Sequence, residues 1–173
     1  MRKDFNFVLT NTEIPYDVIK KKIDQISNWT RGYVTCEISE YSGEIRSYDT
    51  PTTIGLIGSA KFNLTGSVKH VDIQKKLGEI KNENHKYEVY LCVNGLDNYK
   101  YRICFVEYGS ISYPLSLILD SDIAFDCMEQ SKEEYIVENQ IELEEKIDLI
   151  LNSETLGGII QNLIYEAIRI SRM

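Results

Sequence analysis

The sequence predicts an α+β protein, in which a ferredoxin-like βαββαβ sheet is extended by an antiparallel β-meander and two C-terminal helices. Three observations predict this fold class: the first half reads as strand, helix, strand, strand, helix, strand, the next stretch as two more strands, and the last 40 residues as helices. We expect residues 1–94 to form the ferredoxin-like layer. Residues 95–173 are expected to form the meander and the terminal helices, within one compact body.

The elements of the first part follow from their apolar periodicity. Apolar and polar residues alternate in four segments, as in strands with one buried face, and Pro15 suits the first turn of a helix. Helical spacing of Ile73, Leu77 and Ile80 predicts the second helix. We expect strands at residues 4–10, 32–41, 54–64 and 87–93, with the second and third as a hairpin, and a first helix at residues 15–28.

The second part is assigned in the same way. After a turn at Asn94 and Gly95, alternation predicts a fifth strand over Tyr99–Phe105, antiparallel to the fourth. A sixth strand is expected over Tyr113–Asp120, with its leucines on one face. A helix is then expected over Glu133–Leu151.

The last helix is expected to begin at Ser153, a residue type that caps helix N-termini. Its apolar stripe is wide, so we expect it to pack on the sheet of its own chain, with a homodimer through this helix as the alternative. Gly157 and Gly158 lower helix propensity, and close packing against a neighbour would explain their presence.

Charge and composition limit the partners. The chain has 173 residues and a formal net charge of −8, which disfavours nucleic acid and anionic membranes as partners. We therefore expect another protein with a basic surface as the partner. No stretch approaches the roughly 18 apolar residues of a membrane span. The four cysteines are far apart and read as reduced residues of a cytoplasmic protein.

The residues carry no recognisable catalytic pattern. There are two histidines, no paired-cysteine motif, no glycine-rich phosphate loop and no Gly-x-Ser-x-Gly elbow. Asp120, Asp122 and Asp126 could supply oxygen ligands to Mg²⁺ or Ca²⁺, but an acidic turn that opens a helix explains them better. We expect no catalytic residue, no cofactor and no metal, and hence a protein that is not an enzyme.

A polar segment over residues 42–53 is long for a hairpin connection, and such loops often carry function; a tip without function is the alternative. The acidic and aromatic residues in and before it are our predicted partner-binding set. This set is Glu37, Glu40, Glu44, Tyr48 and Asp49. The predicted function is an acidic protein-binding module, for example an immunity or inhibitor protein of a bacterial or phage defence system.

The alternative function is an RNA-associated accessory domain that binds structured RNA on an open sheet face. Lys61, Lys100 and Arg102, together with the tyrosines on that face, would supply cations and stacking surfaces. A basic patch on the folded protein, and an affinity that falls steeply with salt, would distinguish this function.

One resemblance covers residues 2–93. Arg2 to Val8, Ile14-Pro15 before a helix, Glu40-Tyr41-Ser42-Gly43 and Phe62-Asn63-Leu64 before a second helix resemble the ferredoxin-fold anticodon-binding domain of phenylalanyl-tRNA synthetase β chains. In that family the domain contacts tRNA. The Arg-Thr-Leu step that the family has before the second helix is absent, so the resemblance implies the fold and not the tRNA contact.

Overall fold

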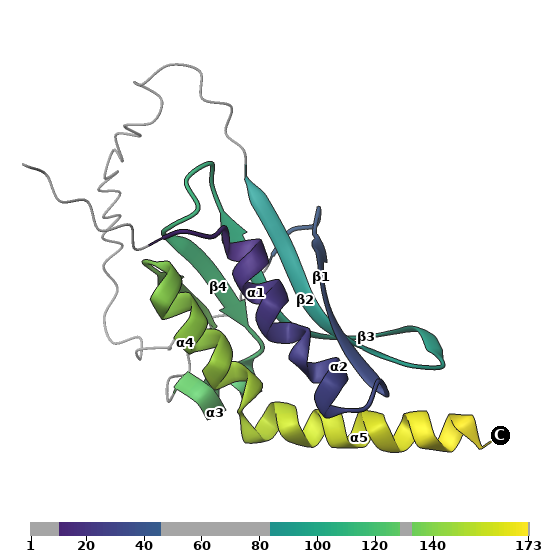
Figure 1. The fold of residues 1–173 in the computed structure, drawn as a ribbon. Coiled ribbons are helices and arrows are strands. Elements are labelled where there is room, and N and C mark those ends of the chain that lie inside the picture. The colour runs from purple at the N-terminus through teal and green to yellow at the C-terminus, as the bar shows by residue number, and fades with distance from the viewer. Residues whose placement is uncertain (1–10, 46–83, 129–132, 173) are drawn as a thin grey trace, which may run out of the picture.

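The computed structural model describes residues 11–45, 84–128 and 133–172 (Figure 1). These residues form a mixed α+β structure, so the predicted class is confirmed. The strands are β1 (Val34–Glu40), β2 (His85–Val93), β3 (Leu96–Tyr108), β4 (Leu115–Leu119) and β5 (Glu134–Val137). The helices are α1 (Pro15–Ile23), α2 (Gln25–Trp29), α3 (Ser121–Met128), α4 (Gln140–Leu151) and α5 (Glu154–Ser171).

The sheet is an antiparallel meander with the strand order β1-β2-β3-β4-β5. The fifth and sixth strands of the prediction are confirmed as β3 and β4. A ferredoxin-like layer is not confirmed, because β1 and β2, its expected second and fourth strands, are paired directly with Val34 opposite Val93. A split βαβ layer would place those two strands at opposite edges. The strands expected at residues 4–10 and 54–64 and the second helix lie outside the described residues.

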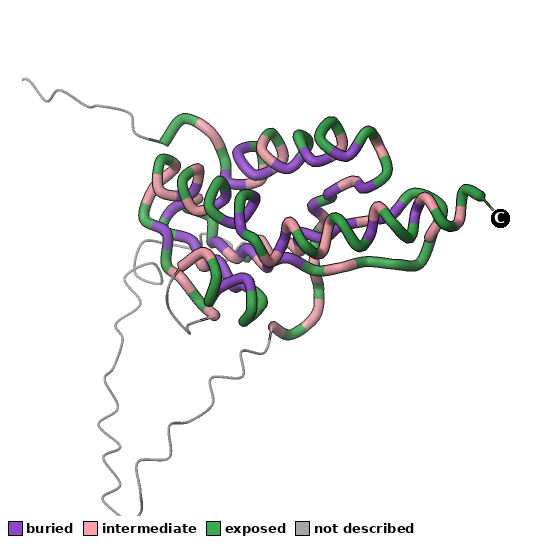
Figure 2. Tube along the Cα trace, turned by 90° about the horizontal axis from the view of Figure 1, so that it is seen from below, coloured by how far each residue is buried: buried purple, intermediate pink, exposed green. Residues whose placement is uncertain are grey.

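Helices α1, α2 and α4 lie on one face of the sheet, and α5 runs across its end (Figures 1 and 2). Alternate strand residues point to these helices and form one core, which joins strands of both predicted parts. Its strand residues include Val34, Cys36, Ile38, Val89, Leu91, Val93, Val106, Leu115 and Leu117. We call the opposite side the open face, because no helix of the described residues lies over it.

The helix predicted over residues 15–28 appears as two consecutive helices, α1 and α2, that meet at Asp24. Pro15 stands at the start of α1, as the sequence predicts. After α2 the chain turns through Arg31 and Gly32, which have φ values of 55° and 78°. Glycine adopts this left-handed conformation without strain, and the turn sends the chain directly into β1.

The prediction of a helix over Glu133–Leu151 is wrong in its first part. Residues Glu134–Val137 form β5, in which Tyr135 lies opposite Leu117 of β4 and Val137 opposite Leu115. The helix begins later because Asn139 caps it: its side chain accepts a hydrogen bond from the Glu142 N–H at 3.0 Å. The Glu142 carboxylate accepts one from the Glu138 N–H at 2.9 Å. These two hydrogen bonds, a side-chain cap from Asn139 and a back-bond from Glu142 to the residue before the cap, mark the true helix start.

Replacing Asn139 with alanine is expected to lower the free energy of unfolding by about 1 kcal/mol, because α4 loses its N-cap. Urea denaturation measures this change. Asn139→Asp is the matched control, since aspartate also caps helix N-termini and should retain wild-type stability within about 0.5 kcal/mol. Wild-type stability in Asn139→Ala would mean that the cap contributes nothing.

The last helix is capped at Ser153, as predicted, by a hydrogen bond from the Leu156 N–H to the Ser153 hydroxyl at 3.2 Å. Leu163 and Ala167 of α5 are part of the core, so the helix packs on its own chain. The expected close packing of Gly157 and Gly158 is not found, because a Cβ at either position meets no described atom within 4 Å. None of the described helices is long and apolar enough to cross a membrane.

Candidate functional site

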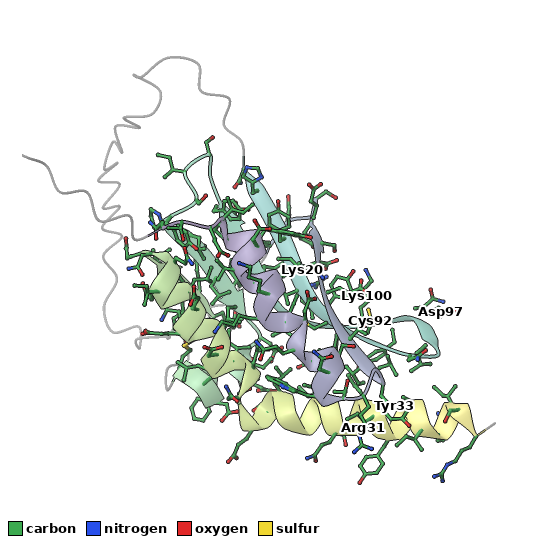
Figure 3. All side chains as sticks on the ribbon, in the orientation of Figure 1. Lys20, Arg31, Tyr33, Cys92, Asp97 and Lys100 are labelled. Carbon is green, nitrogen blue, oxygen red and sulfur yellow. The ribbon has the colours of Figure 1, made fainter. Side chains whose placement is uncertain are left out.

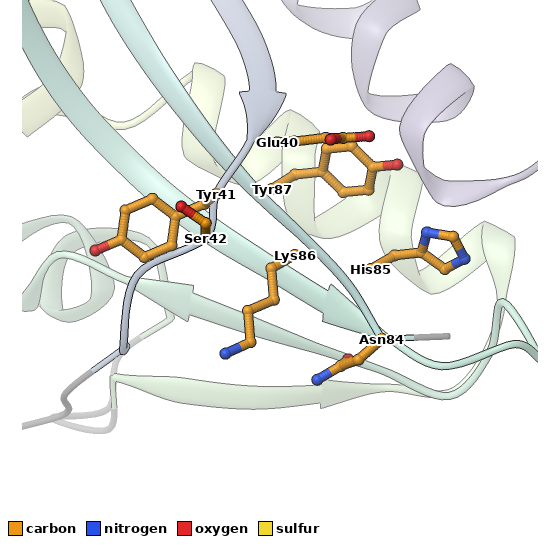
Figure 4. A pocket seen from close by; sticks show the side chains of 7 residues that line it. All are labelled: Glu40, Tyr41, Ser42, Asn84, His85, Lys86 and Tyr87. Carbon is orange, nitrogen blue, oxygen red and sulfur yellow. The ribbon is translucent and has the colours of Figure 1, made fainter. Parts of the chain in front are cut away.

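The predicted partner-binding residues that the structure describes lie on β1 and just after it. Glu37, Glu40 and Glu44 are all exposed, whereas Tyr48 and Asp49 lie outside the described residues. Strand alternation separates the first two: Glu37 points to the open face and Glu40 to the helix side. Figure 4 shows the same division, with Glu40 directed toward the helices and Tyr41 toward the opposite side. The acidic residues therefore flank one strand from both faces.

Strand β1 is an edge of the described sheet. Its Glu37 carboxylate accepts a hydrogen bond from the Tyr90 hydroxyl at 3.1 Å. The donor is a hydroxyl and not a basic side chain, so this contact is not an ion pair. Within the described ranges, no ion pair involves Glu37 or Glu40.

The open face carries a cluster of aromatic and charged side chains from β2 and β3. Arg102 donates two hydrogen bonds to the Glu88 carboxylate, at 3.0 Å and 2.7 Å. Its guanidinium also lies 4.5 Å from the centre of the Phe105 ring and 5.3 Å from that of Tyr41. Bidentate pairing and ring stacking together hold this guanidinium in place.

Lys100 occupies the neighbouring part of the open face. It lies opposite Cys92 in the β2–β3 ladder, and its ammonium group is 4.0 Å from the centre of the Tyr90 ring (Figure 3). Tyr90 in turn donates to Glu37. The two cations that the RNA hypothesis placed here thus share a face, as expected, but a carboxylate lies close to each of them. Lys61 is outside the described residues.

A depression of about 360 Å³ lies where β1 ends and β2 begins (Figure 4). It is lined by Glu40, Tyr41, Ser42, Asn84, His85, Lys86 and Tyr87. Its side chains point to both sides of the sheet, so they do not converge on one ligand position. On the helix side, Tyr87 packs against Tyr16 and Tyr108, with ring centres 5.3 Å and 5.9 Å apart. This depression is a feature of the sheet edge and not an enclosed small-molecule site.

The cysteines of the core are not suited to nucleophilic chemistry. Cys36 and Cys104 are buried, and burial raises the pKa of Cys104 to about 12. Burial also raises the pKa of Cys36. Both thiols therefore remain protonated at neutral pH, and the thiol is a poor nucleophile compared with the thiolate.

Carboxylates of the acidic turn Asp120–Asp126 accept hydrogen bonds at helix N-termini. Asp120 accepts a hydrogen bond from the Asp122 N–H at 3.0 Å at the start of α3, and Asp126 accepts one from the Thr155 N–H at 2.8 Å in the first turn of α5. Carboxylates are favourable at helix N-termini. Among the described residues, no group of His, Cys, Asp and Glu is arranged to hold a metal ion.

Sequence reasoning missed the cluster formed by Tyr41, Glu88, Arg102 and Phe105. Alternation placed Arg102 and Phe105 on opposite faces, because their positions differ by an odd number. The structure has an irregularity in the β2–β3 ladder between Val89 and Tyr90, which brings both to the open face. Nothing in the sequence pattern signals that irregularity.

No family model, no curated protein and no solved structure matches this chain. The inference of function therefore depends on the residues described above.

Proposed function

We propose that this chain is a protein-binding module without enzymatic activity, which uses the acidic edge strand β1 to bind a partner protein with a basic surface. The observation that carries the proposal is the exposure of Glu37, Glu40 and Glu44 along one strand and its continuation. Opposite charge on a partner would accelerate association and fix its orientation. An immunity or inhibitor protein of a bacterial or phage defence system is the specific form proposed, since such proteins act through shape and charge.

The surroundings of β1 support a negative local potential. Lys20, which projects from the adjacent helix α1, is 2.8 Å from Asp24 and is thus already paired. Arg102 is held by Glu88. Lys20 and Arg102 thus have acidic partners other than Glu37 and Glu40, and neither of these two carboxylates forms an ion pair within the described ranges, so both can meet an incoming basic side chain.

The double variant Glu37→Lys/Glu40→Lys is expected to weaken binding of the partner by at least about tenfold, because two attractive contacts become repulsive. The partner is first isolated from native lysate on the tagged wild-type protein in the presence of nuclease, and the affinities of the purified pair are then measured by calorimetry. Glu145→Lys is the control for the effect of a charge reversal elsewhere on the surface, since Glu145 is exposed on α4, and it is compared with Glu37→Lys and Glu40→Lys as single variants. An unchanged affinity in the double variant would refute the proposed surface.

The second candidate function is RNA binding on the open face, favoured by the rings of Tyr41, Tyr90 and Phe105 beside Lys100 and Arg102. It would accord with the resemblance to the tRNA-synthetase domain, which remains a prediction. The charge balance weakens it, because Glu88 neutralises Arg102. The same isolation separates the two functions: recovery of RNA without nuclease, lost steeply as salt rises, would favour the second candidate.

A further inference from the structure

We infer that β1 is a docking edge to which an extended, basic segment of the partner protein adds as a further strand. This inference rests on the proposed function and specifies how the partner is bound. Strand addition uses main-chain hydrogen bonds for affinity and alternate side chains for specificity. Four features of β1 support it: outward backbone groups that meet no partner among the described residues, one closed end, regular geometry and acidic side chains on both faces.

The direction of the backbone groups follows from the β1–β2 ladder. The Asn94 N–H donates to the Tyr33 carbonyl at 3.0 Å and the Tyr41 N–H to the Lys86 carbonyl at 2.9 Å. In an antiparallel ladder, residues that bond to the neighbour alternate with residues whose N–H and C=O point away from it. The odd-numbered residues of β1 therefore bond to β2, and Val34, Cys36, Ile38 and Glu40 direct their backbone groups to the outer side.

Thr30 closes one end of this edge. It is buried at the end of α2, and its hydroxyl lies 2.7 Å from the Val34 carbonyl oxygen and 3.2 Å from the Val34 nitrogen. Both outward groups of Val34 are thus satisfied inside the protein. For Cys36, Ile38 and Glu40 no such partner occurs within residues 11–45, 84–128 and 133–172. Three residues remain whose donors and acceptors can pair with an added strand.

The edge is also regular. Its ladder with β2 runs through all seven residues without a register shift, and it contains no proline, glycine or lysine. Natural sheets usually protect exposed edges with proline, with charged side chains, especially lysine, with bulges or with short strands, and of these devices β1 has only its two glutamates. The other edge, β5, follows that rule, since it has four residues. A segment that adds as a strand requires an edge as long and as regular as β1.

The side chains define the chemistry of the added strand. Glu37 is exposed on the open face and Glu40 on the helix side, so lysine or arginine on either face of an added strand would find a carboxylate. An acidic or neutral segment would lack this attraction. A second copy of this chain would bring Glu37 and Glu40 toward their own counterparts, which makes self-pairing the less favourable occupant.

The first measurement is amide hydrogen exchange by NMR on the full chain. In the free protein, the amides of Cys36, Ile38 and Glu40 are expected to exchange at least about tenfold faster than those of Thr35, Glu37 and Ser39, which bond to β2. Equal protection of both sets at every protein concentration would show that the chain covers its own edge and would overturn the inference. Protection that disappears on dilution would assign the edge to a second copy and would also overturn it.

The second measurement uses a capped peptide of about eight residues, composed of valine, threonine and lysine with lysines on both faces. It is expected to slow exchange at the Cys36, Ile38 and Glu40 amides, whereas the same peptide with glutamate for lysine is not. Two further peptides carry N-methyl groups on every second residue, one on the odd residues and one on the even residues. Only one of these sets has N–H groups that face β1, so methylation of that set should reduce affinity on the order of tenfold and methylation of the other set should reduce it little. Equal affinities of the two methylated peptides, or no slowing at the three amides, would refute strand addition.

A pair of variants then tests the natural partner. The Glu40 N–H points outward and does not bond to β2. Glu40→Pro removes this donor together with the charge, and Glu40→Gln removes the charge alone. Both should remain folded, as checked by thermal unfolding, and the proline variant should bind the partner at least about tenfold more weakly than the glutamine variant. Equal binding of these variants, combined with weak binding of Glu37→Lys/Glu40→Lys, would reject strand addition and retain the acidic surface. Wild-type binding by the double charge variant would reject the proposed function itself.

Discussion

Replacement of Leu91 by alanine is expected to lower the free energy of unfolding by about 2–5 kcal/mol. Leu91 is fully buried on β2, where it lies opposite Cys36 of β1 and Tyr101 of β3 and faces the helices. The truncation removes apolar contacts and leaves a cavity in a layer that both neighbouring strands hold in place. Urea denaturation should show a lower midpoint with an unchanged slope.

The matched control for this prediction is Ile136→Ala on β5. Ile136 is also an aliphatic strand residue, but 54% of its surface is exposed and it points to the open face. Its truncation should change stability by no more than about 0.5 kcal/mol. Similar losses at Leu91 and Ile136 would contradict the assignment of the core to the helix side of the sheet.

Replacement of Thr30 by valine is expected to lower the free energy of unfolding by about 1–3 kcal/mol, although the two side chains have nearly the same shape. The Thr30 hydroxyl is hydrogen-bonded to the backbone of Val34 and lies 2.9 Å from the Ile26 carbonyl oxygen. Valine would leave these buried backbone groups without their partner. Thermal or urea unfolding measures the loss.

Thr30→Ser and Thr35→Val distinguish this hydrogen-bonding role from a packing role. Serine retains the hydroxyl, so Thr30→Ser should be more stable than Thr30→Val. Thr35 is half-buried on the open face of β1, and Thr35→Val should be neutral within about 0.5 kcal/mol. If Thr30→Val were as stable as the wild type, the hydroxyl would have no part in closing the end of the β1 edge.

Local patterns predicted many of the elements correctly. Pro15 and Ser153 marked the starts of α1 and α5, and alternation located β3 and β4. These signals succeed because caps and periodicity act within a few residues along the chain. The strand β5 was missed because a short strand next to an acidic helical segment presents too few alternating positions, although the Asn139 and Glu142 pair marks the helix boundary.

The candidate site was predictable in part. Glu37, Glu40 and Glu44 were singled out from their charge and their place beside a long polar segment, and the structure shows that all three are exposed. Their place on an edge of the described sheet was not predictable, because no local pattern pairs β1 with β2. The ion pair between Glu88 and Arg102 likewise depends on the ladder between β2 and β3, which has an irregularity that no local pattern reveals.

The sequence by itself determined the acidic character of the chain, the α+β class and the type of most elements that the structure describes, because composition and periodicity are properties of the chain alone. Only the tertiary structure decided that β1 pairs with β2, that Val34 is closed by Thr30, and that Cys36, Ile38 and Glu40 direct their backbone groups outward. Strand partners are chosen by contacts between residues about 50 positions apart in sequence, as for Glu37 and Tyr90. Such contacts depend on how whole faces bury one another, which no local pattern encodes.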